Sequence, residues 1–240
     1  MMKVTGLGKT PVEVGAFFSD TWRTYQKILQ HNHMHHRELY ALVHQELQNI
    51  PPGLEILDLG CGDASYTAQS LAGIPFSRYI GVDLSTVALA LAAENFSHLP
   101  GQSEFVTANF VDYAQACSGQ FDCILMSFSL HHLTYGDKDK FLGQLSRVLR
   151  PGGIFLMIDV FREEGESLSD YYQRYIGQAE RNQWKLNPEE FVAMSEHITT
   201  SDLPDSVAAI IGLGQSHGFK DIHCLFLHPD TTIGLLKFQG

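Results

Sequence analysis

The chain has 240 residues, 44% of them hydrophobic, and 16 Lys+Arg against 27 Asp+Glu give it a net charge of −11. This length and apolar content are enough to bury one large core, while the acidic balance, without a basic patch, disfavours nucleic acid and anionic membrane surfaces as partners. The four cysteines show neither zinc-site spacing nor the density of a disulfide scaffold, and the sequence shows no apolar signal core and no run of roughly 20 apolar residues, so we expect a cytoplasmic protein.

The first predicted element is a helix over 34–50, where apolar residues recur at helical spacing before Pro51-Pro52-Gly53 stops it. We expect residues 1–52 to form an N-terminal helical cap segment. His31 and His35 stand at i and i+4, as in some metal sites, but no carboxylate or cysteine nearby completes a ligand set. We therefore predict no metal here and leave the role of the His31–His36 run open.

After Gly53, short apolar runs alternate with helical stretches, which is the pattern of a parallel sheet covered by helices on both faces. The predicted strands are 55–59, 79–83, 104–108, 123–127 and 154–159, and the predicted helices are 64–72, 86–96 and 139–149. This alternation predicts an α/β fold with a doubly wound, Rossmann-like sheet.

Residues 163–203 interrupt the alternation because they are polar, rich in Tyr and Glu, and helical in pattern. Ser169 or Asp170 and Asn187-Pro188 are their predicted helix starts. We predict that this segment forms an inserted helical lid that carries substrate contacts.

The α/β domain then comprises 53–162 and 204–240. Its last part contains a predicted helix near 206–217 and two strands, 219–227 and 231–238. Because so short a link joins the two strands, they must pair antiparallel, and the mostly parallel sheet ends in an antiparallel strand.

The strongest signal for function is Asp58-Leu59-Gly60-Cys61-Gly62, at the junction of the first strand and the first helix. In open α/β sheets, ligands bind at the carboxyl ends of the strands, and glycines let the backbone lie against a ligand there. The next strand ends at Asp83, 25 residues after Asp58, where a carboxylate can accept both hydrogen bonds of a ribose diol. The alternative is that Asp83 only caps the helix that begins near Ser85.

The same turn favours a cationic or zwitterionic adenosine ligand over a dinucleotide. A dinucleotide fingerprint requires a third glycine where this chain has Ser65, and Asp63 would repel an anionic pyrophosphate.

Together with Gly81-Val82-Asp83-Leu84-Ser85, the turn resembles the class I S-adenosylmethionine-dependent methyltransferases. The similarity extends from about Leu54 to Asp159 and returns in the last two strands, and 121–133 and 147–153 also resemble motifs of this family. The resemblance implies a methyltransferase with S-adenosylmethionine as cofactor and S-adenosylhomocysteine as product.

The resemblance also implies residue roles. Asp58 would orient the methionine amino end through the loop, Gly60 and Gly62 would line the methionine moiety, Asp83 would hold the ribose and Leu84 would pack on adenine. Asn109-Phe110 replaces the family's common Asp and apolar pair, and the Asn oxygen can still accept a hydrogen bond from the adenine amino group. The predicted cofactor-binding residues are Asp58, Gly60, Cys61, Gly62, Asp83, Leu84, Asn109, Phe110 and Ser127.

An N-terminal helix often closes over the cofactor in this family, which makes Tyr25, His36 and Arg37 candidates for contacting the cofactor carboxylate. Methyl transfer is an in-line displacement that proximity and a dry pocket can accelerate without a catalytic residue. A general base helps if the acceptor is an alcohol, phenol or protonated amine, and His131 and His132 follow a strand at its ligand-binding end. We name both as candidate catalytic residues; the alternative is that they belong to the loop scaffold.

The acceptor is predicted only by class. Four lid aromatics are either an acceptor cage or the packing stripe of a helix: Tyr171, Tyr172, Tyr175 and Trp184. An aromatic lid and an acidic surface favour a small molecule, but this fold serves many acceptors and does not identify one. The sequence does not decide the oligomeric state.

Three other functions compete with methyl transfer. A nicotinamide-dependent oxidoreductase is opposed by Ser65 and by the antiparallel end of the sheet. A non-catalytic S-adenosylmethionine-binding module would bind without turnover. An enzyme that modifies S-adenosylmethionine itself would need a cationic anchor, for which the candidates are Arg23, Arg37, Arg162 and Arg174.

Overall fold

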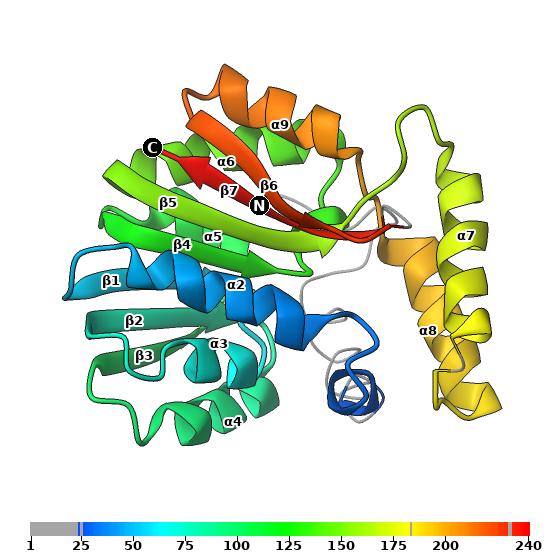
Figure 1. Ribbon diagram of the computed structural model, residues 1–240, viewed down its shortest axis with the longest axis horizontal. Helices are drawn as coiled ribbons and strands as arrows, with labels where there is room; N and C mark the ends of the chain where they lie inside the picture. Colours follow the sequence, from blue (N-terminus) through cyan, green and yellow to red (C-terminus); the bar gives the residue numbers. More distant parts are fainter. Residues whose placement is uncertain (1–23, 25, 183, 230–231) are drawn as a thin grey trace.

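The computed structural model describes residues 24, 26–182, 184–229 and 232–240 of the chain. Within these residues, seven strands form one sheet in the order β3-β2-β1-β4-β5-β7-β6 (Figure 1). The strands are β1 (Leu54–Leu59), β2 (Phe76–Asp83), β3 (Gln102–Thr107), β4 (Phe121–Ser127), β5 (Leu149–Val160), β6 (Lys220–Leu227) and β7 (Ile233–Gln239). Strands β1 to β5 pair in parallel, and β7 is antiparallel to both β5 and β6. The predicted fold class is confirmed.

Six helices cover the two faces of this sheet in the described part of the chain. One face carries α2 (His36–Gln48), α3 (Ser65–Ser70) and α4 (Thr86–Phe96), and the other carries α5 (Phe110–Ala116), α6 (Tyr135–Val148) and α9 (Val207–Ser216). Each face has its own apolar cluster, because the central strands are buried on both sides, as in β1, where Ile56 and Leu57 are fully buried in opposite clusters. A short 3₁₀ turn, η1 (Leu130–His132), follows β4.

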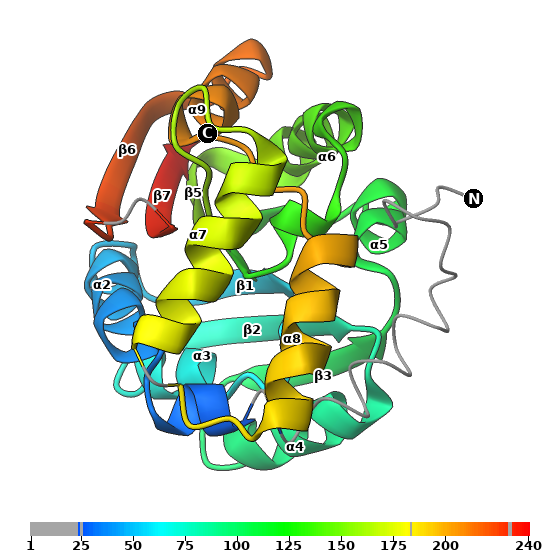
Figure 2. The ribbon, with the colours of Figure 1, turned by 90° about the vertical axis from the view of Figure 1, so that its right-hand side faces the viewer.

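Two further helices, α7 (Leu168–Arg181) and α8 (Pro188–Ser201), lie across the carboxyl ends of the parallel strands (Figures 1 and 2). Helix α7 starts after Ser167, whose hydroxyl accepts a hydrogen bond from Asp170 N, so the predicted start at Ser169 or Asp170 is two or three residues late. Helix α8 starts at the predicted Asn187-Pro188, with a capping box between Asn187 and Glu190. Both helices therefore cover the edge at which a parallel sheet binds ligands.

Two local predictions are wrong. Residues 31–34 form a turn and α2 begins only at His36, so His31 and His35 do not share a helix face. Helix α5 was not predicted, although Asn109 is a good N-cap residue and caps it.

None of the described helices combines the length and apolar character needed to cross a bilayer.

Candidate functional site

The loop between β1 and α3 places its backbone at the carboxyl edge of the sheet. Gly60 and Gly62 have φ angles of 74° and 55°, in the left-handed region that glycine adopts without strain. A Cβ on Gly60 would lie 2.3 Å from the Oγ of Ser129. The N–H groups of Gly60 and Cys61 donate to the carbonyl of Val82, at 2.8 and 3.1 Å. The loop therefore requires glycine at position 60 for both backbone angle and close approach.

Asp83 ties this loop to the start of α4. Its Oδ2 accepts a hydrogen bond from Gly62 N at 2.9 Å, and its Oδ1 accepts one from Ser85 N at 2.8 Å. The N-cap of α4 is Ser85, whose hydroxyl accepts from Ala88 N, so Asp83 is not the capping residue itself. Burial raises the pKa of Asp83, and the hydrogen bonds from Ser85 and Gly62 partly offset this effect. The half-buried carboxylate keeps lone pairs for further hydrogen bonds.

Asp58 lies behind the loop and is 2% exposed. Its Oδ2 accepts hydrogen bonds from the hydroxyls of Tyr79, at 2.8 Å, and Thr67, at 2.9 Å. Burial raises its pKa to about 6, although both hydrogen bonds favour the ionised form. These two partners were not predicted, since they lie on β2 and α3, away from Asp58 in the sequence.

Asn109 takes a role that differs from the predicted one. Its Oδ1 accepts hydrogen bonds from Val111 N, at 2.8 Å, and Asp112 N, at 3.4 Å, as the cap of α5. The oxygen assigned to the adenine amino group is therefore used by the helix, and the side-chain nitrogen is the group that can donate to a ligand ring. Phe110 is buried and packs edge-on against Phe141, with ring centroids 5.3 Å apart. Leu84, next to Asp83, is partly exposed at this edge.

Helix α2 contacts the site through Tyr40, which the sequence did not single out. Its hydroxyl donates to Ser127 Oγ at 2.9 Å, at the end of β4. The ring of Tyr40 lies near those of His36 and Tyr66. Burial lowers the pKa of His36 to about 3, so this imidazole is neutral and offers no positive charge to a carboxylate. The thiol of Cys61 is also neutral, because burial raises its pKa.

The remaining candidate anchors have other partners. Arg37 is exposed and donates to the carbonyl of Gln30. Arg162 donates to the carbonyls of Pro204 and Glu166, and Arg174 pairs with Glu166. Tyr25 and Arg23 lie outside the described residues. These contacts give the described arginines structural roles.

A cavity of about 200 Å³ lies beside the loop, lined in part by Asp63, Ser65 and Tyr66. Residues of the N-terminal segment close its other side, namely Gln26, Leu29 and Gln30. The loop edge is therefore hollowed next to the residues predicted to hold a methionine moiety.

His131 and His132 are brought together with two carboxylates and a third histidine. His131 Nδ1 pairs with Asp159 Oδ1 at the end of β5, and its backbone N donates to Asp159 Oδ2 at 3.0 Å. Burial alone would lower the pKa of His131, but Asp159 and Asp202 outweigh it and raise the pKa. Burial and the neighbouring histidines lower the pKa of His132. Because both nitrogens of His131 face carboxylates, His131 is not poised to take a proton from an acceptor.

The lid aromatics pack against one another and into the apolar cluster of the α2 face. Tyr171, Tyr175 and Trp184 are buried, and the Tyr171 and Tyr175 rings lie 5.6 Å apart. Tyr172 donates through its hydroxyl to the carbonyl of Asp202 at 2.7 Å. This packing favours the stripe of a lid helix over an open cage.

Comparisons with known proteins identify similar domains. Residues 56–153 match a family model described as a methyltransferase domain. The ubiquinone/menaquinone biosynthesis C-methyltransferases UbiE of Vibrio cholerae and Teredinibacter turnerae are similar, at 35% identity over 133 residues and 33% over 141 residues. These alignments cover 52% and 54% of this chain and 48% and 52% of the relatives. The chain thus matches about half the length of these curated relatives.

Solved structures show the same fold at low sequence identity. Magnesium protoporphyrin IX methyltransferase from Synechocystis PCC 6803, with bound SAH, has a TM-score of 0.63 at 15% identity and covers 95% of this chain and 98% of its own. Human N-acetylserotonin methyltransferase in complex with SAM has a TM-score of 0.59 at 13% identity and covers 92% of this chain and 56% of its own.

Proposed function

We propose that this chain carries a methyltransferase domain of the class I S-adenosylmethionine-dependent family and transfers the methyl group of S-adenosylmethionine to a small organic acceptor. The family match supports the predicted family and enzyme class, with S-adenosylmethionine as the methyl donor, and it opposes a nicotinamide-dependent oxidoreductase. The observation that carries the proposal is the left-handed Gly60–Gly62 loop bonded to Asp83.

The residues present fit an adenosine-type cofactor. The half-buried carboxylate of Asp83 can accept hydrogen bonds from a ribose diol, and Leu84 beside it supplies apolar contact for a base. Asp58, Gly60, Cys61 and Gly62 would surround the methionine end, and Asp63 adds negative charge that suits an ammonium group. Asn109 would donate through its side-chain nitrogen, next to Phe110, and Ser127 would be held by Tyr40.

When bound, the cofactor supplies a methyl carbon activated by the positively charged sulfur. The chain's own part is to align this carbon with the acceptor and to exclude water, which is where an enzyme of this kind gains rate. We assign His131 and His132 a positioning role at the end of β4, because their nitrogens contact Asp159, Asp202 and Ser201. The predicted role of a general base stays a prediction.

We assign residues 163–203 to a lid over the acceptor and residues 1–52 to a cap on the cofactor side. Helices α7 and α8 lie across the ligand-binding edge of the sheet (Figure 2). The names of the relatives mention a quinone precursor pathway and a porphyrin, so phenolic and porphyrin acids are reasonable first acceptors to screen.

Calorimetric titration with S-adenosylmethionine and S-adenosylhomocysteine tests the cofactor site. We expect saturable binding of both, lost in Asp83→Ala and retained in Asp139→Ala, a carboxylate that pairs with His217 on the other face of the sheet. Binding of a nicotinamide dinucleotide instead, or equal binding by Asp83→Ala, would overturn the proposal. Binding without turnover across the acceptor screen would identify a non-catalytic binding module.

A further inference from the structure

The side chains of Asp202, His131, His132 and His197 meet beneath the lid. Asp202 follows the last residue of α8, His197 lies on α8, and the other two histidines lie on η1. Asp202 is 4% exposed and His131 is 7% exposed. The cluster therefore joins the lid to the end of β4 through titratable groups removed from water.

Asp202 Oδ1 is buried and makes no hydrogen bond within the described residues. Its three nearest imidazole nitrogens are His131 Nε2 at 3.5 Å, His132 Nδ1 at 3.6 Å and His197 Nε2 at 3.6 Å. These separations are too long for good hydrogen bonds. A buried carboxylate oxygen without a hydrogen bond costs free energy, and an ion held between it and these imidazoles would offset that cost.

The distances match those between ligands of one metal ion. With Zn–N and Zn–O bonds of about 2.0–2.1 Å, neighbouring ligand atoms of a tetrahedral site lie about 3.3–3.4 Å apart. One ligand atom from each of His131, His132 and Asp202 lies within 4.8 Å of the other two. Two imidazoles and a carboxylate form a common ligand set for first-row divalent transition metals.

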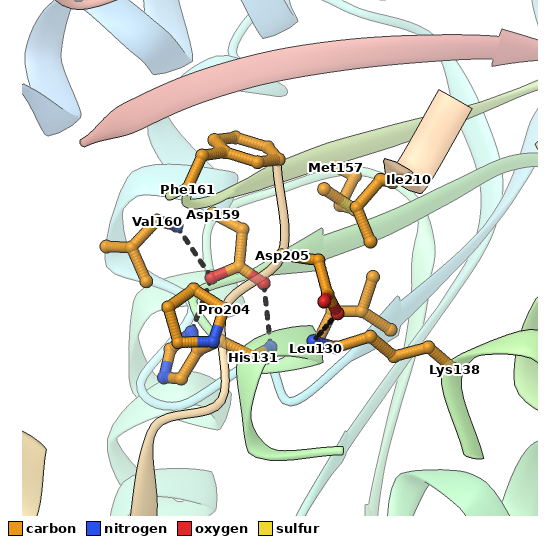
Figure 3. A pocket seen from close by; sticks show the side chains of 10 residues that line it. All are labelled: Leu130, His131, Lys138, Met157, Asp159, Val160, Phe161, Pro204, Asp205 and Ile210. Atoms are coloured by element: carbon orange, nitrogen blue, oxygen red, sulfur yellow. Dashed lines mark hydrogen bonds and ion pairs between the residues drawn. The ribbon is translucent and has the colours of Figure 1, made fainter. Parts of the chain in front are cut away.

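The second contact of His131 has the form found around metal-bound histidines. Its Nδ1 pairs with Asp159, whose carboxylate also accepts hydrogen bonds from the backbone N of His131 and of Val160. A carboxylate on one ring nitrogen fixes the ring and directs the other nitrogen at the metal. Figure 3 shows His131 and Asp159 side by side at the wall of a small pocket.

The charged side chains around this cluster also favour a bound cation. Asp159 and Asp202 bring two carboxylates into one buried region, whereas the buried Lys138 is directed at Asp205, 2.6 Å away (Figure 3). Lys138 also donates to the carbonyl of Leu203. Arg162 also faces Asp205. A divalent ion would balance the two carboxylates with His131 and His132 neutral.

We propose that His131, His132 and Asp202 bind a divalent transition metal ion of the zinc class, with His197 beside Asp202 at the edge of the site. Ligation through His132 Nδ1 replaces its 3.3 Å contact with the carbonyl of Ser201. The ion clamps the end of α8 to η1 and thereby fixes the lid. The site is structural and goes beyond the proposed methyl transfer, which needs no metal.

Zinc titration of the full chain, stripped with a chelator, tests this site by calorimetry. We expect one Zn²⁺ per chain, with affinity at least about tenfold lower in Asp202→Asn and about 10–100-fold lower in Asp159→Asn, which removes the negative charge behind His131. His217→Gln, which alters a histidine paired with Asp139, is the matched control and binds as the unmodified chain does. A double change of His31 and His33 to Gln also keeps the site.

Co²⁺ gives a second readout that does not depend on the variants folding. Co²⁺ bound by nitrogen and oxygen in a tetrahedral site gives intense visible absorption bands, and we expect them in the unmodified chain and not in Asp202→Asn of unchanged circular dichroism. Absence of stoichiometric Zn²⁺ binding and of these bands in the unmodified chain would overturn the proposal. Loss of binding only in the His31 and His33 variant would overturn it as well.

Discussion

Gly60 combines a left-handed backbone with a close side-chain neighbour. A non-glycine residue at its φ of 74° costs about 1–2 kcal/mol, and the added Cβ would also collide with Ser129 Oγ. We expect Gly60→Ala to lower the free energy of unfolding by about 2 kcal/mol or more and to abolish S-adenosylmethionine binding. Urea denaturation and calorimetry measure the two effects.

Gly212 provides the control for this substitution, because it lies inside α9 with open space around its Cβ position. Gly212→Ala is expected to stabilise the protein by about 0.5–1 kcal/mol and to bind the cofactor normally. Equal effects of the two changes would contradict our description of the loop.

Asp58 gives the site a pH dependence. Its pKa is about 6 in the folded protein against 3.8 for an unperturbed aspartate, so the folded state holds the proton more tightly. The free-energy cost of ionising this buried group is absent below pH 3.8, grows as the pH rises, and is complete above about pH 6. The cost is offset when a cationic ligand favours the ionised carboxylate.

We therefore expect the affinity for S-adenosylmethionine to increase between about pH 5 and 7, with a midpoint near the Asp58 pKa of about 6. Calorimetry across this range measures it, and Asp58→Asn should remove the dependence. Affinity that is flat with pH in the unmodified chain, or that rises equally in Asp58→Asn, would rule out Asp58 as the source.

Helix α8 depends on its first turn for its position over the sheet edge. Asn187 accepts a hydrogen bond from Glu190 N at 2.8 Å, and the Glu190 carboxylate accepts one from Asn187 N at 2.9 Å while pairing with Lys27. Loss of such a cap costs about 1 kcal/mol. The capping box therefore contributes to holding α8 in place.

Hydrogen exchange tests this contribution. In Asn187→Ala we expect α8 amides to exchange faster, by an amount equivalent to about 1 kcal/mol, while the central strands keep their protection. Asn187→Ser retains a capping oxygen and should behave as the unmodified chain does. Unchanged protection of α8 in Asn187→Ala would show that tertiary packing alone holds the lid.

At the scale of the molecule, the lid shares a core with the sheet. Tyr171, Trp184 and Ile198 belong to the same apolar cluster as Leu39 of α2 and Ile56 of β1. Helices α7 and α8 are thus linked to the stability of the whole domain.

We expect S-adenosylmethionine at 100 times its Kd to stabilise the protein by about 2.7 kcal/mol. For a chain of this size, that corresponds to a Tm increase of roughly 5–10 °C in a thermal scan. Asp83→Ala should melt at the same temperature with and without the cofactor. No shift in the unmodified chain would argue against a site in the folded domain.

The strands were predicted to within a few residues at most ends. Short apolar runs such as the one in Cys123–Ser127 are typical of strands that are buried on both faces of a sheet. Helix α5 was missed because Asn109 was interpreted as an adenine contact and not as a helix cap. The late start predicted for α7 has a similar cause. Ser167 is the N-cap residue and accepts a hydrogen bond from Asp170 N, whereas the prediction placed the start at Ser169 or Asp170.

The sequence by itself determined the sheet, the glycine loop and the acidic residue at the end of β2, because these depend on local patterns of apolar, glycine and carboxylate residues. Only the tertiary structure decided what the buried polar groups contact. Asp202 lies 71 residues after His131, and Tyr79 lies 21 residues after Asp58, so no periodicity connects either pair. Their meeting follows from how β2, β4 and the lid pack, and packing over such separations leaves no mark in a single sequence.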